Sequence, residues 1–250
     1  MEAMILAAGA GTRLRPLTDQ VPKALVPVRG RPLLAHVMDR LVAAGATRVI
    51  VNACHHAEQI AAYLDAHTPP GVESVLSPEP GGPYDTGGGL LAAASLFRRG
   101  GPFLLHNVDV RSRVPLDVLL AEHRAARERT ANGRPLATLG VQARGSERQL
   151  VFDDEGLMGW ERRGNDAAVL ESQQVRVPVG PIRRWSFSGI HVVEPTMLGL
   201  CDRAGRFSIR TWYLDLVRRG YRIQPVDVSG YEWLDVGTPE RLAEAERREW

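Results

Sequence analysis

One lysine stands apart in a chain that otherwise uses arginine for positive charge. Of the 31 lysines and arginines in the 250 residues, 30 are arginines and one, Lys23, is a lysine. An ammonium is a compact point charge whose pKa its surroundings can tune, whereas a guanidinium is a wide planar fork. Taken alone, Lys23 is equally consistent with a surface lysine retained by chance, but it also marks a position where chemistry would need the smaller charge.

A glycine- and arginine-rich run precedes this lysine and could hold phosphates. From Gly9 to Arg13 it reads Gly-Ala-Gly-Thr-Arg. Glycines let backbone N–H groups approach an anion, and arginine supplies charge in a fork that matches phosphate. A dinucleotide fingerprint would need glycine where Leu14 stands, and the chain has no Gly-Lys-Ser/Thr triplet of a P-loop. We interpret the run as a polyphosphate clamp of another design, with a glycine turn and solvated arginines as the alternative.

The elements around this run alternate between strand-like and helix-like apolar patterns. Strands are expected at 3–8, 48–53, 72–76 and 102–107, and helices at 32–44, 56–66, 89–98 and 116–129. This order predicts an α/β fold with a Rossmann-like, doubly wound, mostly parallel sheet and helices on both faces. The long connection from Gly9 to Arg31 follows the first strand, where open α/β sheets bind ligands.

The pattern changes in the second half of the chain. Strands are expected at 136–141, 148–152, 157–162, 185–193 and 222–228, and helices at 209–219 and 239–249, whereas 163–184 has no clear pattern. We expect one domain over residues 1–250, with a first half at 1–134. The second half, 135–250, is expected to form a mixed β insertion and then return to the sheet.

Composition excludes several classes of function. A net charge of +2 argues against a protein that grips nucleic acid through its overall field. The longest apolar stretch, 90–97, is far shorter than the ~18 residues of a membrane span. The N-terminal apolar run lacks the flanks of a signal peptide, and two cysteines give neither a disulfide framework nor metal-ligand spacing. A cytoplasmic protein without nucleic-acid or membrane partners is expected, with its oligomeric state left open.

The run ILAAGAGTRLRPLT, followed by PKALVPVRG, resembles the opening of the sugar-1-phosphate nucleotidylyltransferases, L-A-x-G-x-G-T-R-L-x-P-L-T and then P-K. The resemblance implies that Arg13 holds the triphosphate and that Lys23 lies against the reacting phosphates, both as catalytic residues. The implied nucleotide-binding positions are Ala8, Gly9, Gly11, Thr12, Arg13, Lys23, Glu79, Gly87 and Gly88.

Later motifs match the same family along the rest of the chain. The segment 85–89, Asp-Thr-Gly-Gly-Gly, resembles the family's T-G-G, whose backbone borders the nucleotide, or it is a capped helix start. The segment 106–109, His-Asn-Val-Asp, resembles N-G-D, and 233–240 resembles W-x-D-V-G-T-P-E. The resemblance implies Mg²⁺ as cofactor, held by Asp109 and Asp235. Val108 replaces the family's glycine and either narrows the ligand space or faces the core.

The same resemblance also implies which residues bind the sugar phosphate. The segment 186–190, Ser-Phe-Ser-Gly-Ile, resembles the family's S-G-I beside the sugar pocket. The implied sugar-phosphate residues are Asn107, Ser188 and Gly189, which makes 135–250 a sugar-binding half and 1–134 a nucleotide-binding half.

The likeness is greatest to the short N-acetylmuramate-1-phosphate uridylyltransferases. It implies a Mg²⁺-dependent, direct in-line transfer from a nucleoside triphosphate, UTP first and GTP next, to a sugar 1-phosphate, in cell-envelope nucleotide-sugar synthesis. Three alternatives stay open. One is an inactive, nucleotide-sensing regulatory homologue, one is a CTP-dependent transferase for an alcohol phosphate such as phosphocholine, and one is a glycosyltransferase on a similar fold.

Overall fold

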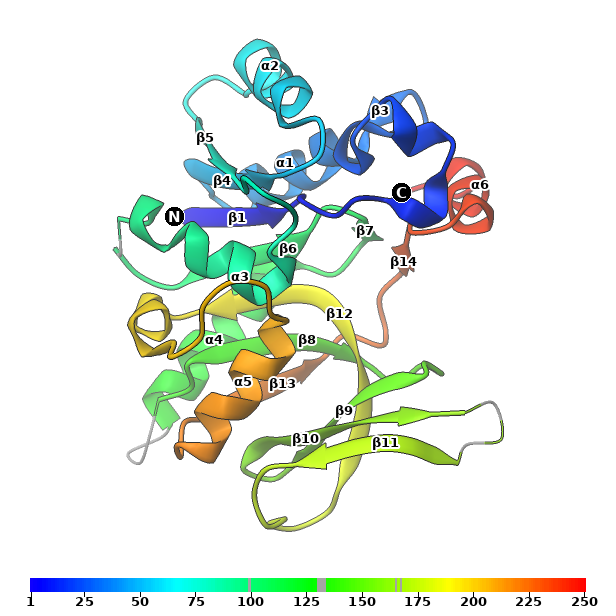
Figure 1. Ribbon diagram of the computed structural model, residues 1–250. Coiled ribbons are helices and arrows are strands. Elements are labelled where there is room, and N and C mark those ends of the chain that lie inside the picture. Colours follow the sequence, from blue (N-terminus) through cyan, green and yellow to red (C-terminus); the bar gives the residue numbers. More distant parts are fainter. Residues whose placement is uncertain (99, 130–133, 165, 167) are drawn as a thin grey trace.

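Strand β1 (Glu2–Leu6) lies in the middle of a four-stranded parallel unit built by the first half of the chain (Figure 1). The computed structural model describes residues 1–98, 100–129, 134–164, 166 and 168–250. Strand β1 pairs in parallel with β4 (Arg48–Ala53) and β6 (Phe103–Asn107), and β4 pairs with β5 (Glu73–Pro78). The carboxyl ends of these strands meet at one edge because the strands are parallel.

The second half continues this sheet with antiparallel and parallel partners. The long strand β12 (Arg183–Val193) pairs antiparallel with β6 and with β8 (Ala137–Gln142), and β13 (Ile223–Asp227) pairs in parallel with β8. The expected mixed insertion that returns to the sheet is therefore present, and one ten-stranded sheet runs through both halves. The single-domain boundary itself stays a prediction.

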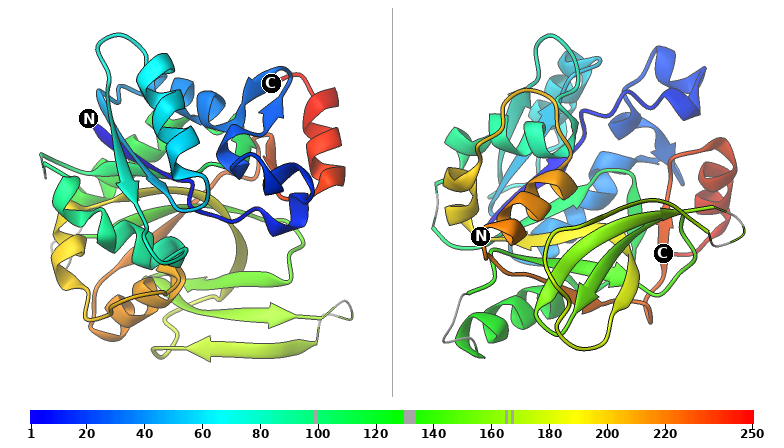
Figure 2. Two further views of the ribbon diagram at one scale, coloured as in Figure 1. Left: turned by 45° about the horizontal axis from the view of Figure 1, so that its top comes forward. Right: turned by 60° about the horizontal axis from the view of Figure 1, so that its bottom comes forward.

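Helices cover both faces of the sheet, as the alternating pattern predicted (Figures 1 and 2). Buried side chains form one apolar cluster on each face. The helices that contribute to the first cluster are α1 (Leu33–Ala43), α2 (Ala57–His67), α4 (Leu116–Arg129) and α6 (Pro239–Arg247). The second cluster is covered by α3 (Asp85–Ala92) and α5 (Ile209–Arg218). No helix among the described residues has the length and apolarity that a membrane span requires.

The first part of β12 leaves the central sheet and supports a three-stranded extension. It pairs with β9 (Arg148–Asp153), which is followed by β10 (Gly156–Arg163) and β11 (Val169–Gln174). Figure 1 shows these strands at the lower right, with β10 beside α5. Strand β11 lies in the stretch 163–184, which had no clear pattern because its residues are largely polar and exposed.

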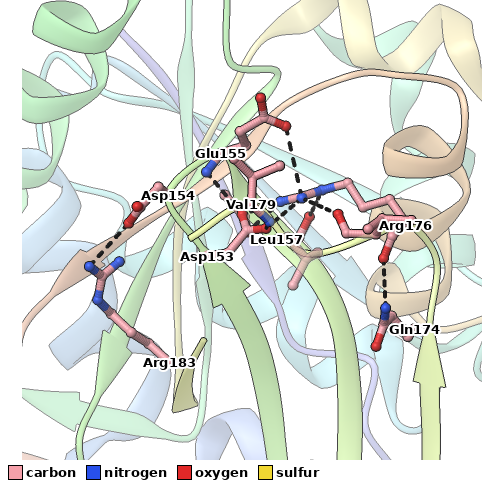
Figure 3. A network of polar contacts seen from close by, with 10 residues as sticks. Asp153, Asp154, Glu155, Leu157, Gln174, Arg176, Val179 and Arg183 are labelled. Atoms are coloured by element: carbon pink, nitrogen blue, oxygen red, sulfur yellow. Dashed lines mark hydrogen bonds and ion pairs between the residues drawn. The ribbon is translucent and has the colours of Figure 1, made fainter. Parts of the chain in front are cut away.

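The buried carboxylate of Asp153 holds the base of this extension together (Figure 3). It accepts hydrogen bonds from Arg176 Nη1 at 2.6 Å, from the Val179 N–H at 2.6 Å and from the Glu155 N–H at 2.9 Å. Burial raises the pKa of Asp153, but the hydrogen bonds from Arg176 and the two N–H groups outweigh it and bring the pKa to about 2. The segment after β11 is thereby tied to the turn between β9 and β10.

Helix α3 differs from the expectation at 89–98: it begins at Asp85 and ends at Ala92. The glycines expected before the helix lie inside it, because they allow the neighbouring segment to approach. A Cβ on Gly87 would lie 2.6 Å from the Phe207 ring, and the Gly87 and Gly88 N–H groups both donate to the Phe207 carbonyl, at 2.9 and 3.1 Å. Close tertiary packing here overrides the low helix propensity of glycine.

Two short ribbons near the sheet edge were also not expected. Strand β2 (Pro27–Val28) pairs with β3 (Arg31–Pro32) inside the long first connection. Strand β7 (Val110–Ser112) pairs antiparallel with β14 (Trp233–Asp235). The second ribbon joins two segments more than a hundred residues apart.

Candidate functional site

A cavity of about 160 Å³ lies where β1 and β6 end, and residues of the predicted clamp and of the start of α3 surround it. Ala8, Gly9, Asn107 and Asp109 line it together with the N-terminal residues of α3. A Cβ on Gly9 would meet nothing within 4 Å, so the backbone at this position borders open space. The parallel strand ends thus place Ala8 and Gly9 of the expected nucleotide residues, and Asp109 of the expected metal residues, around one opening.

Gly11 lets the long first connection fold back on itself. Its φ of +62° is in the left-handed region, and a Cβ there would lie 2.8 Å from Thr18 Cγ2 and 3.2 Å from Lys23 Cβ. The Thr18 hydroxyl donates to the Gly11 carbonyl at 2.9 Å. Three short 3₁₀ turns, at Thr12–Leu14, Leu17–Asp19 and Lys23–Leu25, complete the fold of the loop. Only glycine fits where this loop brings Lys23 against the sheet edge.

Lys23 forms an ion pair with Asp109 although 86 residues separate them. The lysine side chain is only 8% exposed, which excludes a solvated surface lysine. The β7–β14 ribbon places Asp235 opposite Val110, and the Val236 N–H donates to the Asp109 carbonyl at 2.8 Å. The three side chains expected to act together therefore come from three segments and meet in one place.

The carboxyl of Asp235 is electrostatically crowded. Burial and the nearby Asp109 carboxylate raise its pKa, although the positive charges of Lys23, Arg13 and Arg144 act in the opposite direction. Two carboxylates this close favour a bound cation. Mg²⁺ typically takes one or two carboxylates plus substrate oxygens, so this donor set fits it. Among the described residues no group of three or more histidines, cysteines, aspartates or glutamates could hold a metal by itself.

Thr12 and Arg13 are both exposed to solvent. Gly237 makes the approach of Arg13 possible, because a Cβ there would lie 2.6 Å from Arg13 Nη2 and 2.5 Å from Asp235 Oδ1. In the part of the chain that the structure describes, no hydrogen bond or ion pair engages the Arg13 guanidinium. Its fork is free to bind an anion.

The residues Glu79, Gly87 and Gly88 have internal partners on the side of α3. Glu79 is 3% exposed, and its two oxygens accept from Asn52 Nδ2 at 2.6 Å and from the Tyr84 N–H at 2.7 Å. Burial raises its pKa against those hydrogen bonds. Because the Gly87 and Gly88 N–H groups donate to Phe207, the structure gives these three residues a bracing role. The consecutive glycines accompany the expected close backbone approach, here to Phe207, and the role of Gly87 and Gly88 beside the nucleotide stays a prediction.

Asn107, Ser188 and Gly189 are brought together on the acceptor side. A Cβ on Gly189, whose φ is +77°, would lie 2.9 Å from Asn107 Nδ2. Asn107 Oδ1 is buried and accepts no hydrogen bond from the described residues. Ser188 is fully buried and its Oγ accepts from the Ile190 N–H at 3.3 Å, so this hydroxyl supports the strand. Val108 is 4% exposed and belongs to the apolar core, which decides between its two alternatives.

Sequence reasoning missed Arg144, which follows β8. Its guanidinium lies 3.9 Å from the centre of the Trp233 ring, and its Nη2 donates to the Phe187 carbonyl at 3.2 Å. Trp233 and Asp235 are two residues apart on β14 and so share one face of it. Arg144 Nε is buried without a partner among the described residues. One arginine among 30 gave no signal, although its place just after a strand end could have suggested it.

Comparisons with known proteins identify the family of this chain. Residues 2–144 match the family model described as "Nucleotidyl transferase". The chain is 33% identical to an N-acetylmuramate alpha-1-phosphate uridylyltransferase of Neisseria meningitidis, over 98% of this chain and 97% of the relative. It is 28% identical to a mannose-1-phosphate guanyltransferase of Candida albicans, over 96% of this chain and 62% of that protein.

Solved structures show the same fold at lower identity. A UDP-glucose pyrophosphorylase from Acinetobacter baumanii superposes with a TM-score of 0.74 at 16% identity, covering 98% of this chain and 91% of that one. HddC from Yersinia pseudotuberculosis, in complex with GMP-PN, superposes with a TM-score of 0.65 at 20% identity, covering 98% and 97%. With the matched residues and the two named relatives, the chain belongs to the nucleotidyl transferase family, among the sugar-1-phosphate nucleotidyltransferases.

Proposed function

We propose that the protein transfers a uridylyl group from UTP to a sugar 1-phosphate, giving a nucleotide sugar and pyrophosphate. The observation that carries this proposal is the cluster of Lys23, Asp109, Asp235 and Arg13 at the end of β1 and β6. UTP is favoured because two uridylyltransferases are 33% and 32% identical over 98% of this chain, whereas the guanyltransferase from Candida albicans is 28% identical over 96%. A guanyltransferase from Gibberella zeae reaches 38% identity over only 50% of this chain. GTP is the next candidate.

The reaction joins two polyanions. A phosphate oxygen of the sugar 1-phosphate attacks the α-phosphorus, the bond from the α-phosphorus to the oxygen bridging to the β-phosphate breaks, and that oxygen leaves with pyrophosphate. Two unit charges 4 Å apart repel by ~4 kcal/mol at an effective dielectric near 20. Charge neutralisation and positioning are therefore the chief tasks, and no covalent intermediate is needed.

Each charged side chain has a separate task in this proposal. Arg13, whose fork has no hydrogen-bond or ion-pair partner among the described residues, binds the β- and γ-phosphates and the pyrophosphate that leaves. Lys23, buried beside the sheet edge, supplies a compact charge between the α-phosphate and the acceptor phosphate. Asp109 and Asp235 would hold Mg²⁺, which supplies further neutralisation of the triphosphate when bound.

Arg144 is proposed to bind the acceptor phosphate. Stacking on Trp233 fixes its plane on the face of β14 that also carries Asp235, and only one of its nitrogens donates to the protein. Arg144→Gln is expected to raise the KM for the sugar 1-phosphate about tenfold and leave the KM for UTP unchanged, since a charged hydrogen bond is worth about 1.5–3 kcal/mol. Arg162→Gln, which removes an arginine paired with exposed Glu171, is the matched control. Equal increases in both KM values would contradict this role.

Two of the aromatic residues that could serve the alternative of a phosphocholine substrate already hold arginines. Quaternary ammonium groups bind on open aromatic faces. The faces of Trp233 and Trp160 already carry Arg144 and Arg210, at 3.9 and 3.7 Å from the ring centres. These two rings are therefore disfavoured as a cage for a cationic substrate.

A substrate matrix tests the proposed reaction. The four ribonucleoside triphosphates are each paired with N-acetylmuramate, mannose and glucose 1-phosphates, and pyrophosphate release is measured with Mg²⁺. The highest rate is expected with UTP and N-acetylmuramate 1-phosphate, with Lys23→Ala as the inactive control. Release with a sugar 1-phosphate but a different base would correct the nucleotide, and release with no pair would refute the enzyme.

A further inference from the structure

A second hollow, of about 710 Å³, lies between α1, the residues that follow β6 and the C-terminal Trp250. It shares no lining residue with the cavity at the end of β1 and β6. Four of its lining residues carry basic side chains: His36, Arg40, Arg111 and Arg113. The proposed nucleotidyl transfer uses none of them.

Arg111 is the unusual member of this set. It is 8% exposed, its Nε is buried, and no hydrogen bond or ion pair reaches its guanidinium from the described residues. Its guanidinium lies over the ring of Trp250, 5.0 Å from the ring centre. A buried cation without an anionic partner costs several kcal/mol. A folded protein retains such a group at that cost where an anion from outside completes the site.

Arg40 adds a second guanidinium without a carboxylate. It donates to Ser112 Oγ at 2.7 Å and to the Val114 carbonyl, and its Nη1 lies 3.3 Å from His106 Nε2. Burial and the charge of Arg111 lower its pKa to about 10. All of its recorded partners are neutral acceptors, so they leave its positive charge unbalanced.

The acidic residues of the hollow do not balance these charges. Asp39 is bound to Arg31 at 2.7 Å, and Arg113 is the one lining arginine with a carboxylate partner, Glu232 at 2.9 Å. Asp117 is the remaining lining acid, and no ion pair joins it to Arg40 or Arg111. The described side chains therefore leave two guanidinium groups unneutralised around one hollow.

We propose that this hollow binds a phosphorylated small molecule, with its phosphate on Arg111 and Arg40. Guanidinium forks match phosphate oxygens, and the volume lies in the range of about 300–1,000 Å³ that is typical of small-molecule sites. Apolar lining from Ala44, Leu116 and Trp250 can contact the organic part of the ligand. The site is separate from the proposed reaction and does not depend on it.

The β7–β14 ribbon connects the hollow to the cluster of Lys23, Asp109 and Asp235. Arg111 lies on β7 two residues after Asp109, and its partner across the ribbon is Leu234, which precedes Asp235. A ligand on Arg111 is thus bound to the ribbon that carries Asp235 and begins one residue after Asp109. Through this ribbon, a ligand bound at Arg111 can affect the carboxylates of Asp109 and Asp235, and a ligand at those carboxylates can affect Arg111.

Thermal melting with inorganic phosphate, and separately with ribose 5-phosphate, tests this site without nucleotides. The Tm is expected to rise with ligand in the parent and equally in Lys23→Ala, which alters only the cleft. Arg111→Met is expected to weaken binding about tenfold or more, the factor for a lost charged hydrogen-bond pair. Arg218→Met, which removes an exposed arginine of α5, is the control that should behave as the parent.

Thermal melting of Arg111→Met without ligand shows whether the variant still folds. Because Arg111→Met removes an unpaired buried charge, its ligand-free Tm should equal or exceed that of the parent. Arg111→Lys, which keeps the charge but not the fork, should bind phosphate with intermediate affinity. Tighter binding of ribose 5-phosphate than of inorganic phosphate would identify an organic phosphate as the ligand, and equal binding would identify the free ion. An unchanged ligand response in Arg111→Met, or a response lost in Lys23→Ala, would overturn the proposal.

Discussion

Two aspartates in different regions of the molecule show opposite electrostatic designs. Asp153, at the base of the β9–β11 extension, is held by Arg176 and two backbone N–H groups, and its pKa falls to about 2. Asp235, at the sheet edge, lies beside a second carboxylate, and burial with that neighbour raises its pKa. The protein itself neutralises the carboxylate of Asp153, whereas the paired carboxylates at Asp235 favour the binding of a cation. A structural acid and a ligand-binding acid differ in this respect.

Removal of the lysine at the sheet edge is expected to have the largest effect on activity. Lys23→Ala should lower kcat on the order of 1000-fold, because a preorganised charge at a reacting phosphate contributes about that factor. Pyrophosphate release at saturating substrates measures it, and circular dichroism checks the fold. The corresponding change in the extension, Arg176→Ala, should leave kcat per folded molecule unchanged. A near-native kcat for Lys23→Ala would place the lysine outside the reaction.

Asp153→Asn tests the other side of the comparison. Breaking a buried, hydrogen-bonded pair leaves Arg176 without its partner, so the free energy of unfolding should fall by about 3 kcal/mol. Urea unfolding measures this change, with Asp154→Asn as control because Asp154 is about half exposed and only ion-paired with Arg183. Equal stability of the two variants would show that the network of Figure 3 contributes little.

The pH dependence of that difference sharpens the contrast. The folded pKa of Asp153, about 2, lies below the unfolded value, so its stabilisation is fully present above the unfolded pKa of about 4 and is lost as the pH falls toward 2. The gap in unfolding free energy between parent and Asp153→Asn should shrink by about 2 kcal/mol from pH 5 to pH 2. A constant gap across this range would contradict the cause given for the pKa.

Asp235→Asn should have the smallest effect on stability and the opposite sign. Because the charged form of Asp235 is disfavoured in the folded state, the amide should stabilise the metal-free protein slightly while weakening metal-dependent turnover. Urea unfolding in EDTA and a Mg²⁺ titration of pyrophosphate release measure the two effects. Destabilisation of the metal-free protein would mean that Lys23 and Arg13 already balance this carboxylate.

Much of the fold could be predicted because buried strands and helices have apolar residues at regular spacing in the sequence. The strand at 48–53 and the helix at 116–129 have the predicted bounds, since a continuous apolar run and a strong helical pattern leave few alternatives. Strand β11 was missed because it is exposed and lacks that pattern. Helix α3 began four residues early because its glycines are selected by contact with Phe207, which no local pattern reveals.

The site was predictable where strand ends and glycine loops define it. The family resemblance implied that Lys23, Asp109 and Asp235 act together, and the end of β6 accounts for the place of Asp109. Asp235 reaches this place through the antiparallel β7–β14 ribbon, which was not expected. The roles of Arg144 and Arg111 could not be predicted, because they depend on the aromatic rings that these arginines contact and on the lack of an anionic partner. In a chain with 30 arginines, only the structure separates a paired guanidinium from an unpaired one.

Pyrophosphate release by the parent and by Lys23→Arg, measured side by side with UTP, N-acetylmuramate 1-phosphate and Mg²⁺, tests the central claim most directly. A compact ammonium in this confined position predicts an active parent and an arginine variant that is slower by about 100-fold or more, at unchanged folding. Equal rates for the two proteins, or no release by the parent with any sugar 1-phosphate, would contradict the account.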